Sequence, residues 1–170
     1  MTATRMNVLF LCTGNTARSI LAEAILRTLG GDRFNAYSAG SQPKGVVNPL
    51  AIRALKAAGF STDGLRSKSW DEFATPDAPP MDFILTVCDN AAGEACPFWP
   101  GRPASAHWGI ADPAAIEGTE TERQAAFQLA FEHMKARIAA FVALPLAAMP
   151  PEAVKAELGR IGEIAGASCG

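Results

Sequence analysis

The stretch CTGNTARS places Cys12 and Arg18 six positions apart near the start of the chain. A thiolate is a strong nucleophile, and a guanidinium offers a planar set of donors that matches a tetrahedral oxyanion. Gly14 and Asn15 tolerate left-handed backbone, so successive N–H groups of this loop can point into one hollow. The sequence therefore predicts an anion-binding loop with a nucleophilic sulfur beneath the anion.

The elements on either side of this loop suit that chemistry. The apolar run 6–11 predicts a short buried strand that ends at Cys12, and a helical period of apolar residues follows over 17–29. The positive end of that helix and the nearby cation both lower the pKa of such a thiol. Ser19 can also donate a hydrogen bond to the thiolate. The alternative is a small buried cysteine that closes a strand, with Arg18 and Ser19 merely solvated.

Strand-like and helix-like patterns alternate further along the chain. Apolar runs predict strands at 34–38, 83–87 and 104–108, and helical periods predict helices at 49–58, 69–73, 120–144 and after Pro150 and Pro151. The long helix should bury Phe127, Leu129 and Met134. Alternating strands and helices favour an α/β sandwich, in which helices cover both faces of a parallel sheet. Ligands bind beyond the carboxyl ends of such strands, where Cys12 and Cys88 both fall.

Length and composition limit the class of protein. The chain has 170 residues, 49% of them hydrophobic and 19% charged, with a formal net charge of −2. We expect one domain over 1–145 and an appended helix and tail over 146–170. The charge disfavours nucleic-acid and membrane partners, and no segment resembles a signal peptide or a membrane helix. A cytoplasmic protein with reduced cysteines is therefore expected.

The cysteines and histidines show no zinc-ligand spacing. The four cysteines include no C-x-x-C pair, and the two histidines lie far apart in the sequence. We therefore expect neither a metal site nor a bound cofactor. Cys169, in a glycine-rich tail, is expected to have no role in the chemistry.

The segment VLFLCTGNTARS resembles the active-site loop of the low-molecular-weight protein tyrosine phosphatases and of the arsenate reductases built on that fold. The resemblance extends from about residue 6 to residue 144. It implies a four-stranded parallel sheet in a three-layer sandwich, with Cys12 as the nucleophile and Arg18 as the clamp on the oxyanion. The binding loop that it implies consists of Thr13, Gly14, Asn15, Thr16, Ala17 and Ser19. The sequence departs from the family's pattern at two positions. Ala17 stands where many members have a second cysteine, and Ile20 stands where phosphatases usually have proline.

An aspartate-proline pair in the second half of the chain matches the loop that carries the general acid of this family. By the resemblance, Asp112 protonates the leaving oxygen, which departs poorly without a proton. The pair is also a good helix N-cap with proline in the first turn, and both roles can coexist. Phosphatases of the family carry an aromatic residue after the pair. Ala114 and Ala115 stand here instead, and they suit a small inorganic oxyanion better than an aryl ester.

The stretch TVCDNAAGEACPFWPG resembles the redox segment of the reductases. By this resemblance, Cys12 attacks arsenate, Cys88 releases arsenite by forming a disulfide with Cys12, and Cys96 carries the disulfide outward. The final reductant is thioredoxin or glutaredoxin with glutathione. If 89–95 is helical, Cys88 and Cys96 lie about 12 Å apart, too far for a disulfide, so the segment must unwind.

Three functions follow from these patterns. The leading interpretation is a thiol-dependent arsenate reductase of arsenic detoxification. The alternatives are a phosphatase that forms a phosphocysteine at Cys12, and a non-catalytic module that binds oxyanions or senses oxidation. Lys68 falls near a position where some reductases hold a carboxylate that helps to bind potassium, and Glu23 and Ser38 match other parts of that site. An ammonium group in place of the ion predicts activity without a potassium requirement.

Overall fold

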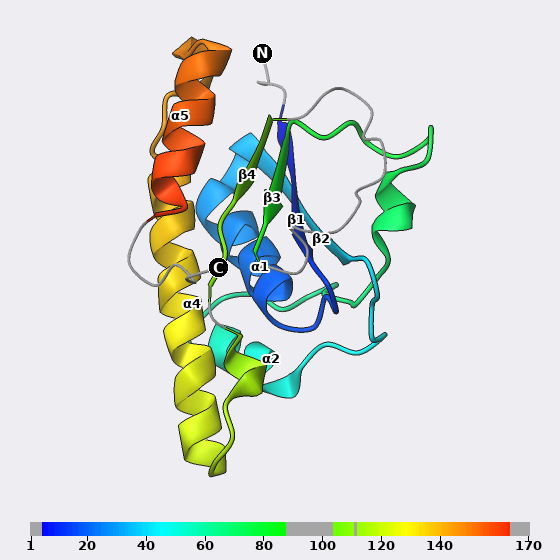
Figure 1. The fold of residues 1–170 in the computed structure, drawn as a ribbon, viewed down its shortest axis with the longest axis vertical. Coiled ribbons are helices and arrows are strands. Elements are labelled where there is room, and N and C mark those ends of the chain that lie inside the picture. Colours follow the sequence, from blue (N-terminus) through cyan, green and yellow to red (C-terminus); the bar gives the residue numbers. More distant parts are fainter. Residues whose placement is uncertain (1–4, 88–103, 111, 164–170) are drawn as a thin grey trace.

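The computed structural model describes residues 5–87, 104–110 and 112–163. Its middle layer is a parallel sheet with the strand order β2-β1-β3-β4 (Figure 1). The strands are β1 (Met6–Cys12), β2 (Phe34–Gly40), β3 (Phe83–Thr86) and β4 (Ala104–His107). This sheet confirms the predicted four-stranded parallel α/β fold. The chain leaves β1 toward β2 and later returns to its other side, so the carboxyl end of β1 is the switch point where such sheets bind ligands.

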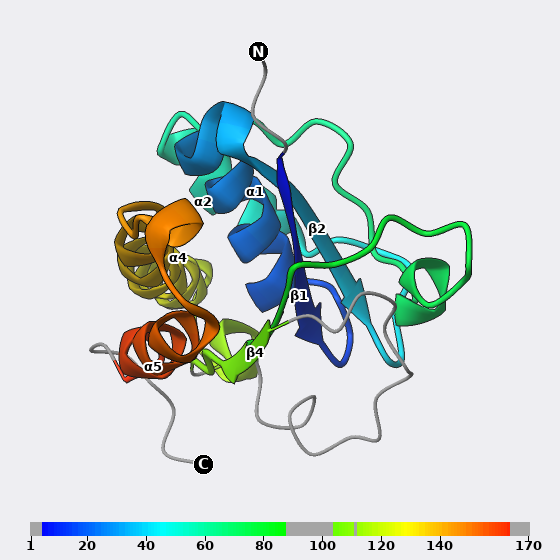
Figure 2. The same ribbon diagram turned by 90° about the horizontal axis from the view of Figure 1, so that it is seen from above.

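The two faces of β1 lie in two different hydrophobic clusters, because successive side chains of a strand point to opposite faces. Val8, Phe10 and Cys12 face the main cluster, which α1 (Arg18–Gly30), α2 (Pro49–Ala57) and α4 (Glu120–Val142) complete. Leu9 and Leu11 face a smaller cluster. This second face is covered by residues that include Phe73 of the 3₁₀ helix Trp70–Phe73. Figure 2 shows the long helices on one side of the sheet and this short helix on the other.

Local signals explain where the helices begin. Asn48 caps α2 by accepting a hydrogen bond from the N–H of Leu50 at 2.9 Å, with proline at the first helical position. Thr119 caps α4 in the same way and accepts from the N–H of Glu122 at 3.1 Å. Both helices therefore start at residues whose side chains accept a hydrogen bond from the first turn.

One core prediction for α4 is wrong. Phe127 and Met134 are fully buried, but Leu129 is 56% exposed. Two residues correspond to about 200° of rotation around an α-helix, so Leu129 and Phe127 lie on nearly opposite sides. The helix is amphipathic, and Leu129 belongs to its solvent face.

The tail helix α5 (Pro151–Ile161) packs on its own chain, against α4 and the edge strand β4. Leu158 and Ile161 are fully buried, and the indole N–H of Trp108 donates to the carbonyl of Leu158 at 2.9 Å. The division of the chain at residue 145 stays a prediction. Within the described ranges, no helix has the length and hydropathy to cross a bilayer.

Candidate active site

The loop between β1 and α1 is fastened from one side by the segment that follows β2. Its carbonyl groups accept three backbone hydrogen bonds: Gln42 N–H to Thr13 at 2.9 Å, Lys44 N–H to Gly14 at 3.2 Å and Asn48 N–H to Thr16 at 2.9 Å. The C=O and the next N–H of a trans peptide point in opposite directions. The amides that follow these carbonyls therefore point away from that segment, as an anion-binding loop requires.

A pocket of about 250 Å³ opens above this loop. Its lining residues are Cys12, Thr13, Gly14, Thr16, Ala17, Arg18, Gln42, Lys44, Asp112 and Ala114. Cys12 is 6% exposed and lies at the end of the central strand, directly before the loop that leads to α1. The structure thus brings together the predicted nucleophile, clamp and acid. Cys88 and Cys96 lie outside the described residues.

The side chains of Asn15 and Ser19 are fully buried. The Asn15 side-chain N–H₂ donates to Ser19 Oγ at 2.8 Å and to Ser38 Oγ at 3.1 Å, and its Oδ1 accepts from the Lys68 backbone N–H at 2.9 Å. These bonds hold Asn15 at a φ of 49°, the left-handed conformation that the loop needs. Because Ser19 Oγ accepts from Asn15, its own hydrogen is left to donate, as stabilising a thiolate requires.

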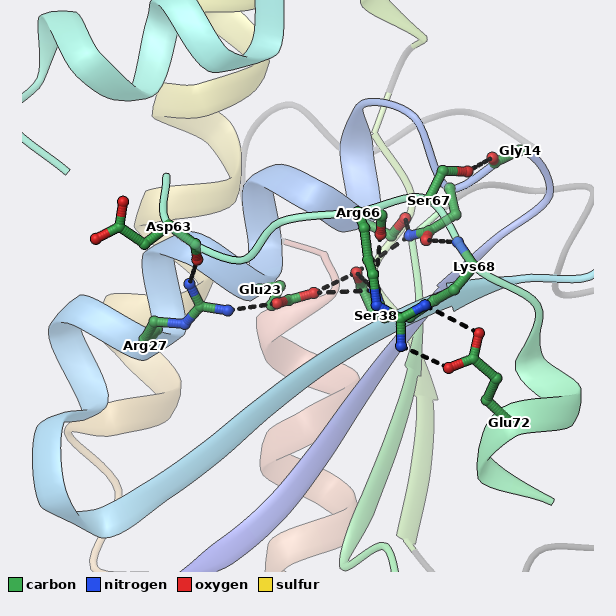
Figure 3. A network of polar contacts seen from close by, with 11 residues as sticks. Gly14, Glu23, Arg27, Ser38, Asp63, Arg66, Ser67, Lys68 and Glu72 are labelled. Atoms are coloured by element: carbon green, nitrogen blue, oxygen red, sulfur yellow. Dashed lines mark hydrogen bonds and ion pairs between the residues drawn. The ribbon is translucent and has the colours of Figure 1, made fainter. Parts of the chain in front are cut away.

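A buried ion pair between Lys68 and Glu23 adjoins this network (Figure 3). The Lys68 ammonium lies 3.6 Å from Glu23 Oε1, and the two side chains are 7% and 6% exposed. It also donates to the carbonyl of Arg66 at 2.8 Å, while Ser38 donates to Glu23. Burial lowers the pKa of Lys68, and the Glu23 carboxylate opposes that shift. An ammonium group therefore sits beside Glu23 and Ser38; potassium independence of the activity stays a prediction.

The depressed pKa of Lys68 has a measurable effect on stability. In the unfolded chain Lys68 keeps its proton up to about its usual value of 10.5, whereas the folded protein releases it at lower pH. Between these values the unfolded chain binds more protons, so the contribution of Lys68 to the free energy of unfolding rises with pH. Urea unfolding should therefore show wild type gaining stability relative to Lys68→Met as the pH is raised toward 10.5.

The exposed Lys56 of α2 provides the matched control. Lys56→Met removes the same charge from a solvated position, so its difference from wild type should stay level over that pH interval. A level difference for Lys68→Met as well would show that the folded protein does not depress the Lys68 pKa.

Arg18 and Asp112 meet at the mouth of the pocket. The Arg18 guanidinium donates to the carbonyl of Ile110 at 3.0 Å, and its other terminal nitrogen lies 3.7 Å from Asp112 Oδ2. Asp112 also caps the 3₁₀ helix Pro113–Ala115, where it accepts from the N–H of Ala114 at 2.9 Å. The capping role and a place beside the clamp thus occur together. The cap fixes the carboxylate beside Arg18.

A buried arginine that the sequence patterns do not single out holds the same loop from the core side. Arg137 of α4 is fully buried and donates to the carbonyl of Gly109 at 3.5 Å and to that of His133 at 3.2 Å. Burial lowers its pKa. The stretch before Asp112 is therefore held by two guanidinium groups, Arg137 at Gly109 and Arg18 at Ile110.

Sequence reasoning also missed the last residue of β2 and the residues that follow it. Gln42 and Lys44 line the pocket, and Gly40 lies directly against the loop. The only available signal is the glycine at the end of the second strand, because parallel pairing places Gly40 opposite Cys12. No local motif marks Gln42 or Lys44.

A cysteine and an arginine at the two ends of an anion-binding loop, set at the switch point of a parallel sheet, define the class of cysteine-dependent enzymes that attack tetrahedral oxyanions. The model of the low molecular weight phosphotyrosine protein phosphatase family matches residues 7–157, and the chain belongs to this family.

Relatives within the family include arsenate reductases. An arsenate reductase of Bacillus licheniformis is 38% identical over 138 residues, which cover 81% of this chain and 95% of that protein. The crystal structure of arsenate reductase from Archaeoglobus fulgidus superposes with a TM-score of 0.63 at 26% identity, over 81% of this chain and 99% of that one. The tyrosine phosphatase Wzb from Escherichia coli K30, solved with sulphate, has a TM-score of 0.65 at 19% identity over 82% and 97% of the two chains, a likeness of fold alone.

Proposed function

We propose that this protein reduces arsenate to arsenite through the Cys12 thiolate, as a step of arsenic detoxification. The observation that carries the proposal is the pocket that joins Cys12, Arg18 and Asp112 above an anion-binding loop. None of the described residues that line it is aromatic, and Ala114 occupies the wall beside the acid. Such a pocket suits a small oxyanion. The 38% identity to an arsenate reductase supports the same conclusion.

The first step joins sulfur to arsenic. The Cys12 thiolate attacks the arsenic of arsenate while the loop amides and Arg18 hold the equatorial oxygens. Asp112 gives its proton to the departing oxygen, which leaves as water. The product is a covalent adduct between Cys12 and arsenic(V), and no electrons have yet reached arsenic. A phosphatase would stop at the equivalent adduct and hydrolyse it.

The second step moves two electrons. In the proposed relay, the Cys88 thiolate attacks Cys12 Sγ, the sulfur–arsenic bond breaks, and its electron pair stays on arsenic, which leaves as arsenite. Cys96 then attacks Cys88, which restores the Cys12 thiolate and leaves a disulfide for an external dithiol such as thioredoxin. One contact supports this assignment. Val87, the residue before Cys88 in the sequence, donates its N–H to the carbonyl of Leu11 at 2.9 Å, next to Cys12 along the chain.

The relay can be tested with thioredoxin, thioredoxin reductase, NADPH and arsenate. Wild type should oxidise NADPH only when arsenate is present and should release arsenite continuously. Cys96→Ser should release about one arsenite per protein and then stop with Cys12 and Cys88 in a disulfide, whereas Cys88→Ser should release none. Cys169→Ser, outside the proposed relay, should match wild type.

The other functions give different results in the same experiment. Steady hydrolysis of an aryl phosphate without arsenite release would identify a phosphatase. Full arsenite release by both Cys88→Ser and Cys96→Ser in the presence of glutathione would replace the relay by a glutathione-dependent route. If neither wild type nor any variant hydrolyses the aryl phosphate or releases arsenite, the protein is an oxyanion-binding or redox-sensing module.

A further inference from the structure

A second cation lines the pocket beside Arg18. Among the described lining residues the ionisable groups are Cys12, Arg18, Lys44 and Asp112. We propose that Lys44 is a second anchor for the tetrahedral dianion and that it sets the affinity of the pocket for dianionic oxyanions. This inference rests on the proposed function, because it concerns the binding of arsenate in that reaction.

The position of Lys44 is fixed by its backbone. Its N–H donates to the carbonyl of Gly14 at 3.2 Å, so the residue is attached to the anion-binding loop itself. Ser67 Oγ donates to the same carbonyl at 3.1 Å and accepts from the N–H of Gly45 at 3.1 Å. Lys44 therefore lies in a turn that is fastened to Gly14 through two groups, and the Ser67 contact is visible in Figure 3.

The side chain of Lys44 lies along the loop. A Cβ atom at Gly14 would meet its Cγ, Cδ and Cε atoms at 3.6–3.7 Å, so the methylene stem runs over this glycine. The stem packs against the loop, and Lys44 is one of the residues that line the pocket. Lysine commonly lays its methylene stem along a surface in this way and keeps its ammonium group in water. Lys44 is exposed, so its charge is accessible to an anion that enters the pocket from solvent.

Charge balance explains why one cation is not enough. Before Asp112 takes up the proton that it gives to the leaving oxygen, the pocket holds a thiolate and a carboxylate, and Arg18 alone leaves it with a net negative charge that repels a dianion. Arg18 is also partly engaged, because it donates to Ile110 and lies 3.7 Å from Asp112. With Lys44 the two cations balance the two anions. The dianion can then approach a neutral pocket and displace Asp112 from Arg18.

The test measures binding apart from turnover. Inorganic phosphate should protect Cys12 from iodoacetamide, and the concentration dependence of that protection, read at the Cys12 peptide, gives a dissociation constant. Lys44→Gln should raise this constant and the KM for arsenate by about 5- to 30-fold at low salt, with kcat nearly unchanged. Lys44→Arg, which keeps the charge, should stay within about threefold of wild type.

Salt distinguishes a charge effect from a structural one. At about 1 M salt the Debye length is roughly 3 Å, so the difference between wild type and Lys44→Gln should shrink to less than about threefold. Lys56→Gln removes an exposed lysine from α2 and should leave the dissociation constant unchanged at every salt concentration.

The results test the role of Lys44 and the proposed arsenate reduction separately. An unchanged phosphate constant in Lys44→Gln, or a change that persists at high salt, would overturn the role of Lys44, as would an equal loss in Lys44→Arg. If wild type binds phosphate in the Lys44-dependent way but releases no arsenite, the proposed reaction fails while the anchor stands. If arsenite release is intact and Lys44→Gln behaves as wild type, only the anchor fails.

Discussion

Cys12→Ser should abolish arsenate reduction, with a loss of at least about 10⁴-fold. A serine hydroxyl is protonated at neutral pH, and neither Arg18 nor the loop amides supply a base that removes its proton. The electron count gives a second reason. Even an oxygen–arsenic adduct has no sulfur at residue 12 for Cys88 to attack, so no disulfide forms and no electrons reach arsenic.

Anion binding separates this chemical loss from a loss of structure. Cys12 is 6% exposed, and serine is close to it in size. Cys12→Ser should therefore still bind phosphate within a few-fold of wild type, measured by calorimetry. Turnover that survives in Cys12→Ser would move the nucleophile to another residue and remove the basis of the mechanism.

The strand, loop and helix around Cys12 are predictable because their signals are local. The apolar run ends where the chain turns, Asn15 adopts the left-handed conformation that asparagine tolerates, and α1 follows at once. The alternation of strands and helices likewise predicts the parallel sheet. These features depend on neighbours in the sequence, so the sequence alone displays them.

The rim of the pocket is not predictable in this way. Gln42 and Lys44 reach the site because β2 pairs with β1 and its last residue, Gly40, lies opposite Cys12. That pairing joins segments about thirty residues apart, and nothing near Lys44 indicates it. Lys68 and Glu23 are predicted to lie near the loop by resemblance to a family, and not from their spacing in the sequence.

Arg137 is a charged residue at a position that helical periodicity assigns to the core. Its spacing from Met134, Ile138 and Phe141 places it on the buried stripe of α4, yet an arginine is normally assigned to the solvent face. The fold resolves the conflict because backbone carbonyls of Gly109 and His133 accept its donors. His133 belongs to α4 itself, but Gly109 lies 28 residues away, and the helix pattern does not contain that partner.

Gly40→Ala should damage the active site more than any other change outside its lining. A Cβ atom at Gly40 would lie 2.4 Å from the Thr13 carbonyl oxygen and 3.0 Å from that of Cys12. Both are backbone atoms of the loop, so they cannot swing aside as the tip of a side chain can. Gly40 itself cannot retreat freely, because its N–H donates to the carbonyl of Lys68 at 2.9 Å.

The loop must therefore shift, and Cys12 moves with it. A displacement of about 1 Å at the reacting sulfur is expected to lower kcat/KM for arsenate about 10²-fold, and the added methyl group to lower the free energy of unfolding by about 1–3 kcal/mol. Gly159→Ala in α5 is the matched control, since its Cβ would meet nothing within 4 Å. It should leave kcat/KM unchanged and stabilise the helix slightly. Wild-type kcat/KM in Gly40→Ala would mean that the loop tolerates displacement and that its close fit against β2 does not position the nucleophile.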